Sequence, residues 1–113
     1  MSTPLPEPTE GAKIVKTDKM YEFAADLFRV LSAPMRLKII NCLREGEKNV
    51  SHLLTEVSTT QPNMSQHLST LYKAGILGRR RDGVQIFYHI ADQRIVSICE
   101  AVCQEIAAHP SDV

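Results

Sequence analysis

The feature that most constrains this sequence is a helical segment followed directly by a hairpin signal. Apolar residues recur at helical spacing from Met64 to Tyr72, and Gly75 is typical of a helix end. The pair Asp82-Gly83 then precedes 84–90, a run rich in β-forming residues that partly alternates. Such a pair before alternating residues is a strong short-range hairpin signal. The chain therefore predicts a helix that leads into a two-stranded β-wing.

A second short helix is predicted just before this one. Asn49 or Ser51 can begin it. A polar turn then ends at Thr60, which can cap the next helix, and Gln61-Pro62 opens that helix. Two helices joined by a short polar turn, with the second helix polar at its start, form a helix-turn-helix pattern.

Three further helices complete the expected fold. Apolar spacing predicts one over 20–31, which Asp18 can cap, and Pro34 suits the first turn of another. Asp92 can cap a last helix whose apolar stripe continues to Ile106. That stripe is wide for the end of a small domain, and a second copy of the same helix is its simplest partner. We therefore expect a mainly α (α+β) winged helix-turn-helix fold, with five helices and a two-stranded β-wing, assembled as a homodimer.

The ends of the chain differ in composition from its middle. Residues 1–16 hold three prolines and few large apolar groups, so we expect a disordered N-terminal tail there. Residues 17–109 are expected to form one domain for DNA binding and dimerisation, followed by a C-terminal tail over 110–113. The start of the chain lacks the basic and apolar regions of a signal peptide, and no apolar run could span a bilayer. We expect a cytoplasmic protein without membrane contact.

Charge is balanced overall but unevenly distributed. The formal net charge is +0, which argues against a surface that is basic throughout. The segment 60–81 nevertheless contains only basic charged residues, whereas 92–113 is mainly acidic. A polyanion would be attracted to the first segment and repelled from the second.

The polar residues of the fourth predicted helix suit double-stranded DNA. Asn and Gln side chains pair bidentately with adenine edges in the major groove, and Ser or Thr binds bases or phosphates. Arginines at the base of a hairpin can follow the backbone or enter the minor groove. His67 lies beside the apolar positions, so contact with DNA and packing both stay open. The predicted DNA-binding residues are Gln61, Asn63, Ser65, Gln66, Ser69, Thr70, Lys73, Arg79, Arg80, Arg81 and Gln85.

Three other interpretations compete with DNA binding. The same residues could form a solvated helix face beside a run of charges, although their order and combination favour DNA. An enzyme is not expected, because the chain has no Gly-rich phosphate loop, nucleophile elbow or metal-hydrolase motif. A protein-interaction module would lack specific DNA binding with a steep salt dependence.

In the fourth predicted helix and the hairpin that follows it, the chain resembles the ArsR/SmtB family of winged-helix repressors. The matching segments are QPNMSQHLSTLYKAGIL at 61–77, RRRDG at 79–83, IFY at 86–88 and LSAPMRL at 31–37. The resemblance extends from about Tyr21 to Cys103. It implies a homodimer joined by the first and last helices, which binds a pseudo-palindromic operator in double-stranded DNA and is released from it by an effector.

Metal sensing of the kind found in this family is only weakly indicated. One family site uses a Cys-Val-Cys type pair at the start of the third helix, where this chain has Asn49-Val50-Ser51-His52. Another begins Asp-x-His on the last helix, where this chain has Asp92-Gln93-Arg94. Both departures argue against zinc, nickel or cobalt, and no firm metal site or cofactor is expected.

The three cysteines, Cys42, Cys99 and Cys103, are the candidate effector residues. Cys99 and Cys103 are four residues apart and share one helical face. They could offer two thiolates to a soft ion such as arsenite, Cu(I) or Cd(II), with a third from Cys42 or the dimer mate. Purely structural cysteines are the other alternative, because free cysteine is among the most buried residue types.

Redox sensing through disulfide or persulfide formation is the hypothesis adopted. Similar sensors of reactive sulfur join a cysteine on the second helix to one on the last helix, and Cys42 with the Cys99/Cys103 pair imitates that layout. The match is offset: the two corresponding positions here are Asn41 and about Ala107. One residue on a helix is about 100° of rotation, so the offset matters.

Overall fold

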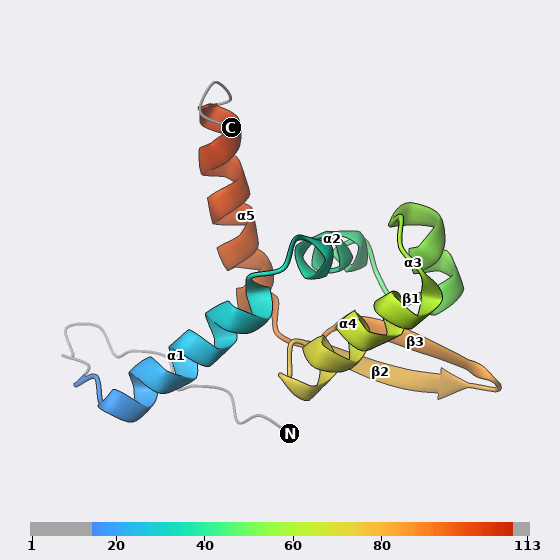
Figure 1. The fold of residues 1–113 in the computed structure, drawn as a ribbon, viewed down its shortest axis with the longest axis horizontal. Helices are drawn as coiled ribbons and strands as arrows, with labels where there is room; N and C mark the ends of the chain where they lie inside the picture. The colour runs from blue at the N-terminus through green and yellow to red at the C-terminus, as the bar shows by residue number, and fades with distance from the viewer. Residues whose placement is uncertain (1–14, 110–113) are drawn as a thin grey trace.

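The computed structural model describes residues 15–109 (Figure 1). Its five helices and short strands confirm the expected mainly α fold. The tails predicted over 1–16 and 110–113 lie outside the described residues, except for residues 15 and 16. In chain order the elements are α1 (Asp18–Leu31), α2 (Pro34–Leu43), β1 (Lys48–Asn49), α3 (Val50–Glu56), α4 (Gln61–Lys73), β2 (Leu77–Asp82), β3 (Gln85–Ile90) and α5 (Gln93–Ala108).

Side-chain caps define where the helices begin. Thr60 caps α4 by accepting a hydrogen bond from the Asn63 amide at 3.3 Å, as predicted. Asn49 rather than Ser51 caps α3. The prediction for α1 was wrong by one residue, because Thr17 accepts from the Met20 amide and Asp18 is already helical. In the first turn the Asp18 carboxylate still faces the positive end of the helix dipole.

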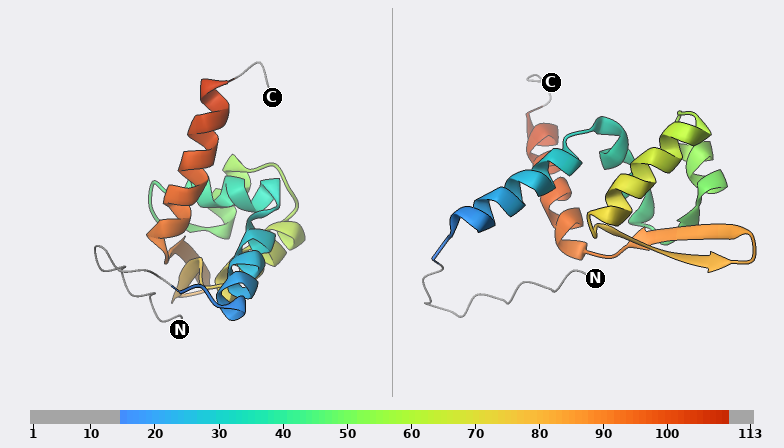
Figure 2. Two further views of the ribbon diagram at one scale, coloured as in Figure 1. Left: turned by 90° about the vertical axis from the view of Figure 1, so that its left-hand side faces the viewer. Right: turned by 60° about the horizontal axis from the view of Figure 1, so that its bottom comes forward.

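Within residues 15–109 the sheet has three strands, so the two-stranded wing was an incomplete prediction. The antiparallel order is β1-β3-β2, and the register pairs Lys48 with Tyr88 and Asn49 with Phe87. Gly83 has a φ of +63° in the turn, which glycine adopts without strain. The β2–β3 hairpin extends beyond the helices (Figure 2).

The core lies where α2, α3 and α4 meet the sheet. Ile39, Leu53 and Leu68 are fully buried there and bring these three helices together. By contrast, α1 and α5 pack chiefly on α2 and extend away from the body (Figure 1). Much of their surface is therefore uncovered in one chain. Among the described residues, no helix is long and apolar enough to cross a membrane.

Candidate nucleic-acid interface

Burial of one face of α4 turns its polar face outward. Met64, Leu68 and Leu71 are fully buried and anchor the helix against α3 and the sheet. Most of the predicted DNA-binding residues on α4 are on the other side. Gln61, Asn63, Ser65, Gln66 and Lys73 are exposed, and Ser69 and Thr70 are half-buried. The Thr70 hydroxyl donates to the Gln66 carbonyl at 3.0 Å, which leaves it only as an acceptor for DNA.

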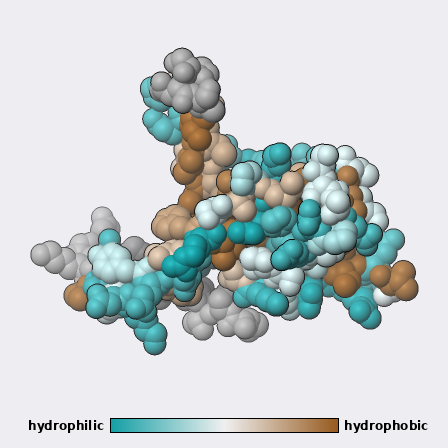
Figure 3. Space-filling model, in the orientation of Figure 1, coloured by the Kyte–Doolittle hydropathy of each residue, from teal (hydrophilic) through white to brown (hydrophobic). Residues whose placement is uncertain are grey.

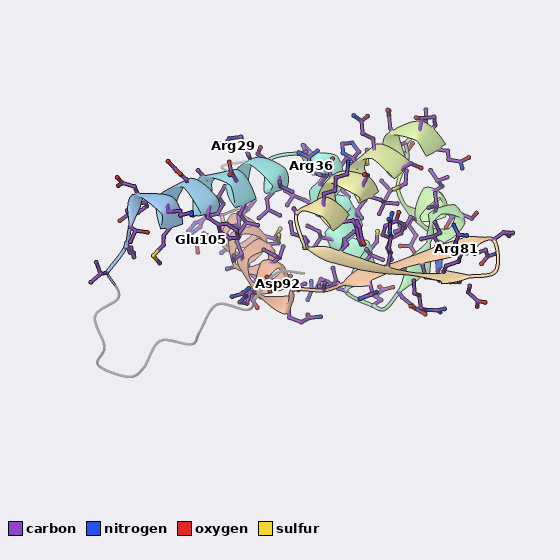
Figure 4. All side chains as sticks on the ribbon, turned by 90° about the horizontal axis from the view of Figure 1, so that it is seen from below. Arg29, Arg36, Arg81, Asp92 and Glu105 are labelled. Carbon is purple, nitrogen blue, oxygen red and sulfur yellow. The ribbon has the colours of Figure 1, made fainter. Side chains whose placement is uncertain are left out.

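The hairpin separates the three arginines onto two faces. Side chains alternate along a strand, so Arg79 and Arg81 share one face and Arg80 lies on the other. The Arg79 guanidinium lies 4.0 Å from the ring centroid of Tyr72 on α4, which identifies the α4 side of the sheet. Arg81 is exposed toward the tip of the hairpin (Figure 4). These two cations extend the polar surface of α4.

Arg80 is already paired within the protein. Its Nε donates to both carboxylate oxygens of Glu47 at 2.9 and 3.1 Å, and its Nη2 contacts the same carboxylate. The guanidinium also lies 4.6 Å from the ring centroid of Phe87. The hydrogen bond from Arg80 holds the pKa of Glu47 below its usual value. Sequence reasoning missed Glu47, because it lies far outside the acid-free segment.

Gln85 shares the outer face of the sheet with Arg80. The Asn49 side-chain amide donates to the Gln85 carbonyl oxygen at 3.1 Å. The structure therefore groups Arg79 and Arg81 with the α4 residues, and it places Arg80 and Gln85 on the opposite face of the wing. His67, left open by the sequence, is half-buried and contacts Arg36 from α2 at 3.2 Å.

The three cysteines do not come together. Cys99 and Cys103 line an apolar groove of about 320 Å³ bounded by α1, α2 and α5. The lining residues on α2 include Asn41 and Arg44 but not Cys42. Cys42 instead lies on the side of α2 near α3, where burial and then the charge of the nearby Glu56 carboxylate raise the pKa of its thiol. Cys42 and the groove that holds the other two thiols thus lie on different sides of α2.

Burial disfavours the reactive form of two of these thiols. Desolvation, followed by the nearby Glu56 carboxylate, raises the pKa of Cys42. Desolvation, followed by the nearby Cys103, raises the pKa of Cys99. The thiolate is the nucleophile and the metal ligand, so both shifts reduce reactivity at neutral pH. Within residues 15–109, no group of three or more His, Cys, Asp or Glu side chains is arranged to hold a metal ion.

Known proteins are similar to this chain in sequence. The model of the arsR family of bacterial regulatory proteins matches residues 33–78. An uncharacterised HTH-type transcriptional regulator of Methanocaldococcus jannaschii is 40% identical over 83 residues, which cover 73% of this chain and 93% of that one. The biofilm growth-associated repressor of Agrobacterium fabrum is 34% identical over 102 residues, covering 88% and 87% of the two chains.

A solved protein structure is also similar to this chain, both in fold and in sequence. The crystal structure of Rv0081 from Mycobacterium tuberculosis has a TM-score of 0.74 and 32% identity, and the match covers 85% of this chain and 97% of that one. The match thus extends over almost all of that chain. The protein belongs to the ArsR family of bacterial regulatory proteins, and it is a winged helix-turn-helix, DNA-binding transcriptional regulator rather than an enzyme.

Proposed function

We propose that this protein is a cytoplasmic homodimeric repressor that places two copies of α4 in the major groove of operator DNA. One observation carries the proposal: the exposed side of α4 continues onto the α4 side of the hairpin without an acidic residue. The Agrobacterium fabrum relative is a repressor by name, which supports the same direction of regulation here.

The side chains divide into base readers and phosphate binders. Asn63 and Gln66 are exposed near the start of α4, and their amides suit adenine edges. Lys73, Arg79 and Arg81 supply cations for the phosphates. Gln61, Ser65, Ser69 and Thr70 complete the proposed surface, whereas Arg80 and Gln85 would have to exchange their present partners to join it.

Dimerisation is proposed through the uncovered helices α1 and α5. Apolar side chains gather along α5 where it rises above the body (Figure 3). Large exposed apolar groups of this density mark an interaction surface. A two-fold axis between copies would set two α4 helices on successive turns of the duplex. The exposed apolar residues on these helices are Met20, Tyr21, Phe23, Phe28, Ile98, Val102 and Ile106.

The effector is proposed to act on Cys99 and Cys103. Their groove adjoins both proposed dimer helices, so modification of either thiol would disturb the dimer and with it the spacing of the α4 helices. Persulfide formation needs only one thiolate, which takes a sulfane sulfur from a polysulfide while the shortened polysulfide leaves, whereas a soft ion would bind both thiolates. Cys42 is left out of this proposal, because it faces Glu56 on the other side of α2.

The first experiment measures DNA binding directly. The reduced protein selects duplexes from a random pool, and affinity for the selected duplex and for a random one is then compared at two salt concentrations. Preference for the selected duplex with a steep salt dependence supports the repressor, and its absence contradicts it.

The same duplex then distinguishes the effector classes. Loss of binding with polysulfide, absent in Cys99→Ala/Cys103→Ala, supports thiol sensing. Loss with arsenite or Cd(II) alone supports the soft-ion alternative. Binding that survives every reagent in the wild type indicates structural cysteines.

A further inference from the structure

Arg36 connects the end of α1 to α4. Its Nε donates to the Val30 carbonyl of α1 at 2.5 Å, and its Nη1 lies 3.2 Å from Nδ1 of His67 on α4. Both contacts are partly buried. Figure 4 shows Arg36 between the end of α1 and α4. One guanidinium therefore joins a helix of the proposed dimer surface to the helix of the proposed DNA surface.

The chemistry of this contact assigns the hydrogen-bond roles of Arg36 and His67. Arginine has five N–H donors and no acceptor, so Nδ1 of His67 must accept the hydrogen bond. A side chain without an acceptor at this position cannot keep the contact. This Arg36 bridge from Val30 to His67 therefore requires a hydrogen-bond acceptor on α4 and, on α2, a side chain that can donate in two directions.

The Val30 end of the bridge satisfies a backbone group that α1 cannot satisfy itself. The last carbonyls of a helix have no intrahelical partner, and Val30 lies one residue before the end of α1. The neighbouring Arg29 carbonyl is satisfied locally by Ser32. Because α1 packs chiefly on α2, the bond from Arg36 to Val30 is one of the contacts that hold the angle at which α1 leaves the domain.

We propose that Arg36 is a positioning residue that sets the orientation of α4 relative to the dimer helices through His67. This inference rests on the proposed function, because the two α4 helices match two half-sites only if each is held at a defined angle to the dimer axis. Arg36 does not contact DNA in this role. Its contribution is to the spacing that the dimer recognises.

The test uses three duplexes and a small set of variants. The duplexes are the one selected by the wild type, the same one with one base pair inserted between its half-sites, and a random one. His67→Leu and Arg36→Gln are expected to weaken binding to the selected duplex about tenfold, the order expected for losing a charge-assisted hydrogen bond. Both are expected to lose discrimination against the insertion, while random DNA binds as before.

Three controls separate positioning from folding and charge. His67→Asn keeps an acceptor close to the Nδ1 position, and it is expected to restore discrimination. Lys38→Gln removes a positive charge from the exposed surface of α2, outside the proposed dimer and DNA surfaces, and is expected to change nothing. Arg36→Gln/His67→Leu is expected to lose no more than either single change, because both break the same contact.

The outcomes distinguish a failure of this inference from a failure of the proposed function on which it rests. A wild type that prefers no duplex contradicts the proposed function itself. A wild type that discriminates, with folded variants that discriminate equally well, overturns only the role of Arg36. Equal losses on all three duplexes also overturn it. If Arg36→Gln unfolds, Arg36→Lys keeps the charge with a single ammonium, and undiminished discrimination there contradicts the bridge.

Discussion

Arg80 and Glu47 form an ion pair on the outer face of the wing, between residues that lie 33 positions apart in the sequence. The carboxylate occupies the Nε and Nη2 edge of the guanidinium, which is one edge that binds a phosphate in bidentate fashion. A bidentate phosphate contact through this edge of Arg80 must therefore displace Glu47, whereas among the described residues no acid is paired with Arg79 or Arg81. The number of arginines at 79–81 is therefore larger than the number of cations that are available to DNA without breaking an ion pair.

Arg81→Ala should weaken DNA binding more than Arg80→Ala. Arg81 is exposed near the hairpin tip on the α4 side, so its loss should remove one phosphate contact and lower the salt slope by about 0.9. Affinity for selected and random duplexes should fall alike. Titration by fluorescence anisotropy at several salt concentrations measures this. Equal effects of the two substitutions would show that Arg80 leaves Glu47 on binding.

Glu47→Gln should tighten binding to random DNA and steepen its salt dependence. The substitution removes a negative charge near the duplex and frees Arg80 for a phosphate. Glu45→Gln is the matched control, because it makes the same charge change two residues earlier, away from Arg80. An increase of the same size in both variants would assign the effect to net charge alone.

Glu56→Gln should destabilise the fold, because it leaves Lys48 without its main partner. Lys48 is only 6% exposed, and its Nζ lies 2.8 Å from both Glu56 oxygens. The variant should unfold at a lower temperature than the wild type, and Glu45→Gln should change the midpoint less. An unchanged midpoint would show that Lys48 reaches solvent when Glu56 is neutral.

The same pair should make stability depend on pH. The hydrogen bond from Lys48 lowers the pKa of Glu56 below its usual value. A lowered carboxyl pKa contributes stability above the unfolded pKa, about 4.3, and that contribution is lost as the pH falls through the folded pKa. Urea unfolding at neutral and acid pH should show a larger loss in the wild type than in Glu56→Gln. Parallel losses would indicate other carboxylates.

Diamide should not form a disulfide between Cys42 and either of the other cysteines within one chain. Cys42 faces Glu56, whereas Cys99 and Cys103 line the groove on another side of α2. Bridging needs Cα atoms within about 7 Å and facing side chains. Peptide mapping by mass spectrometry without reduction identifies any bridge. A Cys42–Cys99 peptide in the monomer fraction would contradict the separation seen here.

Val102→Glu should prevent dimerisation while leaving the domain folded. Val102 is 56% exposed on α5, so a charge there costs little in one chain but much in an apolar interface. The variant should sediment as a monomer and lose the selected duplex, with its helical circular dichroism preserved. A dimer of wild-type affinity would place the interface elsewhere.

Local patterns predicted most of the fold. Helix spacing and caps identified α1 to α5, because i to i+4 bonding and apolar periodicity are properties of short segments. Asp82-Gly83 located the turn for the same reason. The strand β1 was missed, because two residues, Lys48 and Asn49, are too few to show alternation, and their pairing with β3 is non-local.

Local patterns in the chain specify the helices, the hairpin and the polar composition of the α4 surface. How these elements pack sets which of the polar and charged groups are available to DNA. The packing pairs Arg80 with Glu47, turns Cys42 away from Cys99, and bridges Val30 to His67 through Arg36. Each of these relationships involves residues from different parts of the fold. Such relationships depend on how the elements pack around α2, and no local pattern in the chain records that packing.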